Sequence, residues 1–359
     1  MIDNVSNLRN MVTSKRRNTE SVMFYLHYRV TFLLIMFCCI LVSSTAFSDT
    51  RIACSSNPNN DISEAMLESY CWASSTYSVK SAYIGKRGKE VPHPGIGSSE
   101  DPSEYTYRNF YQYIHLVLFI QALLFYIPHM VWKPIDSQHM QIINDLITEC
   151  SPEGKSESLS TAASFIRAKW GTHRAFALLY FLCEVAAIIN IFIQALLLNK
   201  YFTGKFLDLG LIYARYYQAE HTEQPIDLFP LITSCHFKRY GASGHIDVVD
   251  ALCVLPYNAL NVKIYLFLWL WFVILLALSA VNQFNFLMKM TIPTYRTLFQ
   301  RLFYHSKVIP GHDNFISLMT KGNFGDWFVL SAVKSSMEEM IFYDLMEHLE
   351  QKMDLRKEE

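Results

Sequence analysis

The chain has 359 residues, of which 51% are hydrophobic and 18% are charged, and its formal net charge is -1 at pH 7. Because there is no basic surplus to release counterions from phosphates, we exclude nucleic-acid binding as a function. The apolar residues are concentrated in stretches that are too long for ordinary core helices, which indicates an integral membrane protein.

Four stretches are long and apolar enough to cross a bilayer as helices, which takes roughly 20 residues each. They are residues 30–47, 113–132, 175–198 and 264–288. The only formal charge in them is that of Glu184. A charge inside the bilayer is costly, so its near-absence supports four transmembrane helices. No small-x-small cleavage pattern follows the first stretch, which we therefore interpret as a retained signal anchor.

The segments between these spans are residues 1–29, 48–112, 133–174, 199–263 and 289–359. In the first, Ile2, Val5 and Leu8 recur at helical spacing and predict a short amphipathic helix. This helix either lies on the membrane or folds into a pore, and the pattern does not choose between the two. Apolar residues at near-helical spacing in the last segment predict a cytoplasmic helical subdomain.

Charge and cysteine positions predict the orientation of the chain. An even number of spans places both termini on one side, with 19 Lys and Arg residues there and 12 in the two opposite loops. Each opposite loop holds one pair of cysteines. The pairs are Cys54 with Cys71, and Cys235 with Cys253. Such pairs are typical of an oxidising compartment, so we expect extracellular loops and cytoplasmic termini. Four cysteines allow three pairings, and spacing does not choose among them.

Two residues within the spans are candidates for gating or packing. Pro128 bends the second span, either as a gating hinge or, the interpretation we favour, as a static kink that shapes packing. Glu184 is either a pore or gating carboxylate or a buried group that bonds a neighbouring helix, and we favour the buried group.

Neither catalysis nor a cofactor is expected. No phosphate-binding glycine loop, zinc motif or nucleophile elbow occurs where the predicted structure would support it. His115 and His129 flank the second span without companions at ligand spacing, so we predict no metal site.

Several stretches carry a family resemblance. The longest is CHFKRYGASGHIDVVDALCVLPYNALNVKIYLFLWLWF, residues 235–272; the others are Tyr70-Cys71-Trp72, QALLFYIPHMVWK at 121–133 and Gly-Asp-Trp-Phe at 325–328. Together they resemble the innexins, invertebrate gap-junction proteins, over nearly the whole chain. The family's Y-Y-Q-W is altered here to Phe110-Tyr111-Gln112-Tyr113, which indicates a divergent insect-type or virus-borne (vinnexin-like) member.

The resemblance implies an all-α membrane protein: four transmembrane helices, two disulfide-linked extracellular loops and a cytoplasmic helical subdomain. Such subunits form a homo- or hetero-oligomer with other innexins, typically an octameric hemichannel. This hemichannel docks to one on the adjacent cell or works unpaired. The channel would pass ions and small metabolites across the plasma membrane at gap junctions, or across a host cell membrane if the chain is virus-borne.

The resemblance also assigns residues. It implies disulfides between Cys54 and Cys253 and between Cys71 and Cys235. The N-terminal helix with Ile2, Val5 and Leu8, together with the first span, would line the pore, and no cofactor is needed.

Three other interpretations agree less well with the sequence. A non-conducting four-span adhesion or scaffold protein of claudin or tetraspanin type would concentrate its cysteine motif in one loop, whereas this chain has one pair of cysteines in each of two loops. A membrane enzyme would need a cluster of nucleophile, base or metal ligands within the membrane or at its surface, and the sequence does not indicate one. A connexin would have three cysteines in each loop, whereas each loop here has two.

Overall fold

We describe the fold from a computed structural model. It describes residues 19–48, 51–57, 62–85, 88–148, 155–218, 228–296, 298, 322–336 and 339–354. The chain divides into two compact units. The first comprises Met1–Phe32, Leu124–Ile191 and Leu275–Glu359, and the second comprises Leu33–Leu123 and Phe192–Ile274. Each unit therefore contains a part of every long helix.

Four helical segments of the described chain are long and apolar enough to cross a membrane, which confirms the four predicted spans. The first consists of α2 (Val22–Tyr25), the π-helical turn η1 (Leu26–Val30) and α3 (Thr31–Ala46). The others are η4 (Phe110–Tyr113) with α5 (Ile114–Thr148), α7 (Arg174–Tyr201) and α9 (Pro256–Thr291). Helices α5 and α9 extend beyond the apolar stretches, since a helix can continue where hydrophobicity ends.

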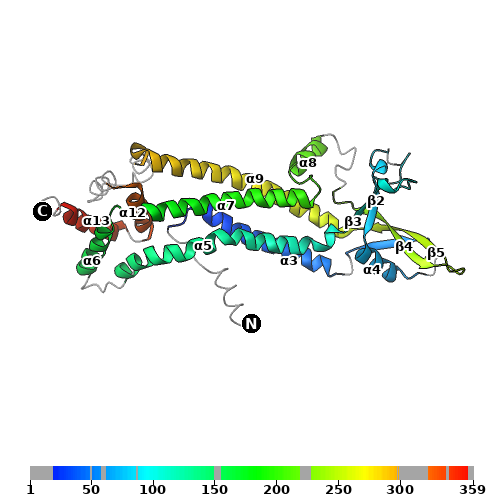
Figure 1. Ribbon diagram of the computed structural model, residues 1–359, viewed down its shortest axis with the longest axis horizontal. Helices are drawn as coiled ribbons and strands as arrows, with labels where there is room; N and C mark the ends of the chain where they lie inside the picture. The colour runs from blue at the N-terminus through cyan, green and yellow to red at the C-terminus, as the bar shows by residue number, and fades with distance from the viewer. Residues whose placement is uncertain are drawn as a thin grey trace. The chain divides into compact units, whose positions relative to one another are not determined.

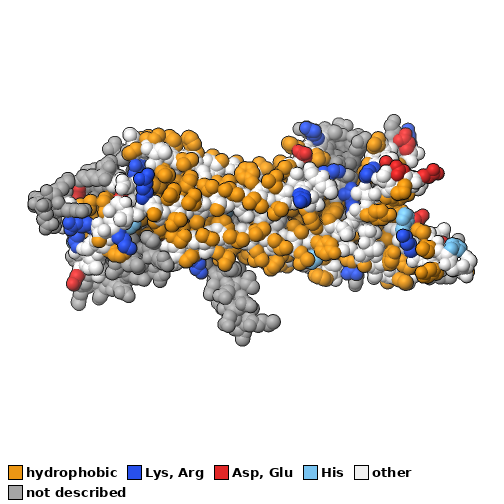
Figure 2. All heavy atoms as spheres, viewed as in Figure 1, with side chains coloured by type: hydrophobic (Ala, Val, Ile, Leu, Met, Phe, Trp, Pro, Cys, Tyr) orange, Lys and Arg blue, Asp and Glu red, His pale blue; other side chains and the backbone are white. Residues whose placement is uncertain are grey.

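The outward faces of these helices are apolar. Figure 2 shows hydrophobic side chains covering the long helices on the face in view, whereas charged side chains gather over α6, α12 and α13 and over the loops. Phe37 and Ile40 on α3, for example, are each 62% exposed. An apolar surface of this kind requires lipid or a neighbouring subunit as its surroundings.

The second unit contains a five-stranded antiparallel sheet with the strand order β1-β5-β4-β2-β3. Its strands are β1 (Ala53–Ser56), β2 (Thr76–Val79), β3 (Tyr105–Arg108), β4 (Ile232–Tyr240) and β5 (Ile246–Val254). The four membrane-spanning helices of the predicted all-α fold are confirmed, but the fold is mostly rather than entirely helical, because the loops form this sheet. It joins strands from two loops that are far apart in the chain.

Strands β4 and β5 form the long hairpin seen in Figure 1. Burial alternates along β4, where Thr233, Cys235 and Phe237 are buried and their neighbours are not. This period of two is that of a strand with one covered face. In the turn, Gly244 has φ +83°, a left-handed conformation that glycine adopts without a steric penalty.

Shorter helices accompany the sheet in the second unit. They are α4 (Glu64–Ser74), η2 (Ser81–Tyr83), η3 (Pro102–Glu104) and α8 (Leu209–Gln218). Leu67 and Cys71 of α4 are buried and lie four residues apart, which places them on the same face of the helix.

In the first unit, three helices form a small bundle, visible around the labels α6, α12 and α13 in Figure 1. They are α6 (Lys155–Ala168), α12 (Phe324–Ser336) and α13 (Glu339–Asp354). Leu159, Ala162 and Ile166 of α6 are buried at helical spacing where this helix packs against α13. The predicted helical subdomain is thus present, and it also includes α6 from the segment before the third span.

Candidate functional site

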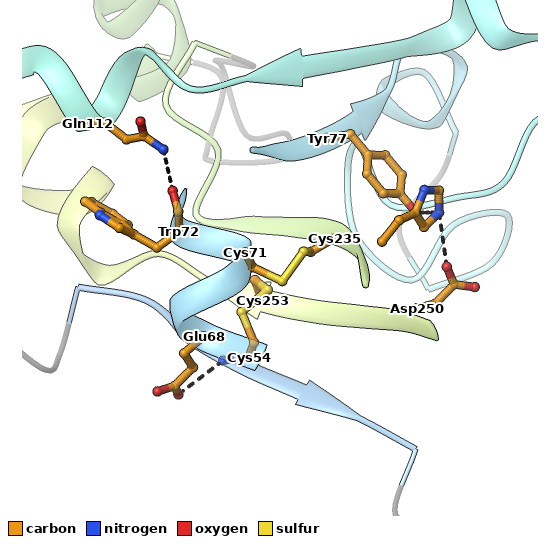
Figure 3. The surroundings of a disulfide bond; sticks show 10 residues. Cys54, Glu68, Cys71, Trp72, Tyr77, Gln112, Cys235, Asp250 and Cys253 are labelled. Carbon is orange, nitrogen blue, oxygen red and sulfur yellow. Dashed lines mark hydrogen bonds and ion pairs between the residues drawn. A yellow bond between two sulfur atoms is a disulfide. The ribbon is translucent and has the colours of Figure 1, made fainter. Parts of the chain in front are cut away.

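Two disulfides connect the first loop to the second. Cys54 and Cys253 are paired directly across β1 and β5, with their Cα atoms 4.1 Å apart. Cys71 on α4 is bonded to Cys235 on β4, with a Cα–Cα distance of 5.9 Å, so this disulfide holds the helix on the sheet (Figure 3). These are the two pairs that the resemblance implies. We call the sheet, α4 and the two disulfides the loop platform.

The residues on either side of Cys71 add aromatic contacts. The Tyr70 ring packs edge-on against Phe237 of β4, with centroids 4.8 Å apart. The Trp72 ring lies 5.1 Å from Tyr111, where the second span begins, and 5.6 Å from Tyr257, at the start of α9. The Tyr-Cys-Trp triplet therefore fastens α4 to the sheet on one side and to the beginnings of two spans on the other.

Two side-chain amides tie the spans to the loops. Gln112 donates a hydrogen bond to the backbone carbonyl of Trp72 (Figure 3). Asn258, which is fully buried, donates to the carbonyl of Pro230 at 2.9 Å. Pro256 occupies the first position of α9, where its missing N–H costs no helical hydrogen bond. Polar residues of the family motifs thus fix where the platform joins the membrane helices.

A polar cluster lies on β2, β4 and β5. The hydroxyl of Tyr77 is 2.6 Å from Nε2 of His236, and the same nitrogen is 3.0 Å from Oδ1 of Asp250. Tyr77 and Asp250 are labelled in Figure 3. Burial, with a smaller contribution from the Asp250 charge, raises the pKa of Tyr77 to about 12. Further along the hairpin, Arg239 and Asp247 form an ion pair at 2.9 Å.

In the first unit, residues Thr19–Ser21 precede the first span and bond to two other spans. Thr19 donates a hydrogen bond to Asp136 of α5 at 2.6 Å. The hydroxyl of Ser21 donates to the carboxylate of Glu184 on α7, and the backbone N–H of Ser21 donates to Tyr180 at 2.7 Å. We call Thr19–Ser21 with these partners the clamp.

The middle residue of the clamp, Glu20, is 3% exposed. It accepts a hydrogen bond from Tyr28 at 2.7 Å, and its carboxylate lies 3.2 Å from Nδ1 of His129. The rings of Tyr28 and His129 stack with centroids 3.8 Å apart. His129 thus has a packing partner, Tyr28, in the first helical segment and an acidic partner, Glu20, just before it.

Glu184 is 5% exposed and lies among hydrogen-bond donors. Besides Ser21, the hydroxyl of Tyr180 donates to it at 2.8 Å and the side-chain amide of Asn282 on α9 lies 3.3 Å from both of its oxygens. A buried carboxylate needs such donors, because its desolvation is costly otherwise. Glu184 can be identified from the sequence as the one charged residue in a predicted span, but none of these partners can.

The Gly-Asp-Trp-Phe motif joins α12 to the turn before α7. A Cβ added to Gly325 would lie 2.3 Å from the backbone carbon of His173, so only glycine allows this approach. Asp326 is buried and accepts a hydrogen bond from the backbone N–H of Gly171 at 3.0 Å. The ring of Phe328 lies 5.1 Å from that of Tyr180. The motif therefore docks the helical bundle against the third span.

The remaining predicted residues are placed as follows. Pro128 lies within α5, which continues as one helix on both sides of it. Ile2, Val5 and Leu8 lie outside the described residues. His115 accepts a hydrogen bond at its carbonyl from Cys39.

Within the described part of the chain, the one group of potential metal ligands is that of Cys54, Cys71 and Cys253. All three sulfurs belong to disulfides, so they are not thiolate ligands.

Comparison with known proteins identifies the family of this chain. The model of the innexin family matches residues 20–353. The chain belongs to the innexin family. Innexin shaking-B of Drosophila melanogaster is 32% identical over 97% of this chain and 94% of its own length. Innexin inx2 of Schistocerca americana is 31% identical over 93% of each chain, and innexin inx1 of the same species is 30% identical over 94% of this chain and 93% of its own.

Innexins are the channel subunits of invertebrate gap junctions. This innexin is accordingly a multi-pass membrane protein of gap junctions and a subunit of an intercellular channel for ions and small metabolites. It assembles into an oligomer with other innexins. The loop platform and the clamp are the two sites of this innexin at which a role in the channel can be argued from the geometry.

Proposed function

We propose that this innexin forms an octameric hemichannel and that the loop platform docks head to head with the platform of a hemichannel on the adjacent cell. One observation carries the docking role of the platform: the two loops form a single sheet, closed by disulfides between Cys54 and Cys253 and between Cys71 and Cys235. The octamer is the assembly that membership of the innexin family leads us to expect.

The disulfides suit the platform to docking. They join residues that are 199 and 164 positions apart, so each removes much of the conformational freedom of the unfolded chain. A surface that is ordered before it meets its partner loses less entropy on binding. Disulfides also form in oxidising compartments, which supports a platform outside the cell and both termini in the cytoplasm.

The pore is proposed to be lined by the N-terminal segment with Ile2, Val5 and Leu8 and by the first span. The clamp supports this, because it ties residues Thr19–Ser21, where that segment ends, to neighbouring spans. Conduction would then depend on the diameter and charge of this lining. The partners of Glu184 and the unbroken α5 around Pro128 support packing roles for both residues.

Junctional conductance between paired cells tests the proposal. The double variant Cys71→Ser/Cys235→Ser removes the disulfide that holds α4 on the sheet without leaving a free thiol. We expect wild-type pairs to conduct and pairs of the double variant to lose junctional current. The matched control is Cys183→Ser, which changes a buried cysteine outside the disulfides.

Surface biotinylation must show that each variant reaches the plasma membrane. Wild-type protein that is present at the surface but passes no junctional current would contradict docking, and hemichannel current under the same conditions would identify an unpaired channel. An oligomer mass different from eight subunits would overturn the octamer alone.

A further inference from the structure

The first unit contains a pocket of about 240 Å³ next to the clamp. It is lined by residues of the clamp, of α7, of the last turns of α9 and of α12, all of which belong to this one unit. Its volume is below the roughly 300–1,000 Å³ of pockets for drug-sized ligands. The pocket is therefore of a size to hold a small polar group rather than a nucleotide or a whole lipid.

One part of the lining supplies hydrogen-bond donors. Trp327 is 6% exposed, and its indole N–H has no hydrogen-bond partner within the described chain. The hydroxyl of Ser331, one helical turn further along α12, is buried and also without a partner there. Lys289 of α9 adds a cation whose Nζ lies 5.9 Å from the centre of the Trp327 ring. Buried donors without acceptors are costly, so a ligand that accepts hydrogen bonds would stabilise this wall.

Another part of the lining is acidic. Glu184 contributes a carboxylate, whereas the side chain of Glu20 is fully buried against Tyr28 and His129, so the lining presents one negative charge, on Glu184, and one positive charge, on Lys289. A carboxylate has about four acceptor sites, and three side chains donate to Glu184, so about one acceptor site of this carboxylate is left for a ligand. A purely anionic ligand would be repelled by the carboxylate of Glu184, and a purely cationic one would leave the donors of α12 unsatisfied. The lining therefore fits a group that carries both charges.

The position of the pocket indicates where such a group comes from. Lys289 lies in the last turn of the fourth span, and Lys and Trp are residues that favour the membrane–water interface. At this depth the abundant small zwitterions are the headgroups of phospholipids. The aromatic rings of Phe286 and Phe328, which also line the pocket, provide apolar contacts for the methylene groups next to the charges.

We propose that this pocket binds the headgroup of a zwitterionic phospholipid, with the phosphate at Lys289, Trp327 and Ser331 and the ammonium at Glu184. Because the clamp forms part of the lining, the bound headgroup stabilises the point at which the N-terminal segment joins the first span. The inference goes beyond docking and pore formation and depends on neither.

Ligand binding to the purified, delipidated full-length protein in detergent tests the proposal. The probes are short-chain phosphatidylethanolamine, short-chain phosphatidylglycerol, which lacks the ammonium, and free phosphoethanolamine, which lacks the acyl chains. We expect phosphatidylethanolamine to raise the unfolding temperature in a saturable way and phosphatidylglycerol to bind at least about tenfold more weakly, as loss of one charged hydrogen bond implies.

Two variants keep the test independent of folding. Trp327→Phe removes the indole N–H and keeps the aromatic ring, and Lys289→Met removes the cation. We expect each to weaken phosphatidylethanolamine binding about tenfold. The matched control is Lys334→Met, also on a lysine near aromatic rings, those of Phe342 and Tyr343, but outside the pocket lining.

The outcomes separate the possibilities. Equal binding of the two lipids, or binding that neither Trp327→Phe nor Lys289→Met weakens, would overturn the site. If free phosphoethanolamine bound as tightly as the lipid, the proposal that the bound headgroup belongs to a membrane lipid would be wrong. Because the purified protein is measured without a junction, these results do not depend on whether hemichannels dock.

Discussion

The hydroxyl of Ser21 donates a hydrogen bond to the carboxylate of Glu184, 163 positions later in the chain. This bond connects the start of the first span to the third, and Asn282 brings the fourth span to the same carboxylate. Glu184, the one formally charged residue in the four predicted spans, thus connects the first, third and fourth helical segments.

We expect Glu184→Ala to destabilise the protein, by about 1–3 kcal/mol for each buried donor that loses its acceptor. Glu184→Gln keeps one carbonyl acceptor and should be less severe. The measurement is the thermal unfolding of the purified oligomer, followed by size-exclusion chromatography after heating. Leu182→Ala, at a 52% exposed position of the same helix, is the control. Equal losses in the Glu184→Ala and Leu182→Ala variants would show that the carboxylate has no special packing role.

The sulfurs of Cys54, Cys71 and Cys253 lie within 4.8 Å of one another. Whether a single cysteine substitution leads to disulfide exchange therefore depends on which cysteine is replaced. In Cys235→Ser the thiol of Cys71 is freed next to the other disulfide. Its thiolate can attack Cys54 or Cys253, form a new bond and release the other cysteine as a thiol, with no net oxidation.

We therefore expect Cys235→Ser to yield a mixture of Cys54–Cys71, Cys71–Cys253 and the original Cys54–Cys253 bonds. In Cys71→Ser the remaining thiol is that of Cys235, which is outside the three-sulfur group, and the Cys54–Cys253 bond should persist. Peptide mapping by mass spectrometry without reduction distinguishes these bonds. The same bond pattern in the two variants would contradict the arrangement of the sulfurs.

The four spans are predictable from one sequence because the bilayer admits few alternatives: a spanning segment must be apolar and long, and both properties are local. The pairing of Cys54 with Cys253 is not local. Its prediction came from the family resemblance, since three pairings were possible.

The sheet illustrates a different limit. Burial alternates along β4 and β5, but their sequences, ITSCHFKRY and IDVVDALCV, do not alternate between apolar and polar residues, so the pattern that predicts a half-buried strand is absent from them. Strands β1, β2 and β3 have four residues each, too few for a period of two to be recognised. The partners of Glu184 could not be predicted either, because bonds between distant residues leave no pattern in a single chain.

Tyr77 makes the loop platform sensitive to alkaline pH. Its pKa is about 12 in the folded protein, mainly because of burial, and about 10 in an unfolded chain. The folded state thus holds the proton at a pH where the unfolded state loses it. The contribution of Tyr77 to stability is complete below about pH 10 and is lost as the pH rises toward 12.

We expect the unfolding temperature of the wild type to fall more steeply between pH 10 and 12 than that of Tyr77→Phe, which cannot ionise at this position. Below pH 10 the variant should be the less stable protein, since it lacks the hydroxyl that contacts His236. Parallel pH profiles would indicate that the hydroxyl is solvated.

The docking of α12 against the turn before α7 can be tested by substituting Gly325. Gly325→Ala would place a methyl group 2.3 Å from the backbone of His173, so α12 must shift and lose part of its contact with α7. We expect a lower unfolding temperature and faster proteolysis near this helix. Gly241→Ala is the matched control, because its added Cβ would be 3.4 Å from the nearest atom, on the His245 ring. Equal effects of the two substitutions would contradict a specific need for glycine at Gly325.

The assignment of Val5 to the pore lining can be tested by chemical modification, because the described free cysteines Cys38, Cys39 and Cys183 are buried. We expect a positively charged thiol reagent to reduce the current of Val5→Cys hemichannels, since a cation fixed in the lining repels permeant cations. Asn7→Cys lies on the opposite face of the predicted helix and should be insensitive, as should the wild type. Block of Asn7→Cys but not of Val5→Cys would place the polar face toward the pore, and the apolar face with Ile2, Val5 and Leu8 would then pack against lipid or protein.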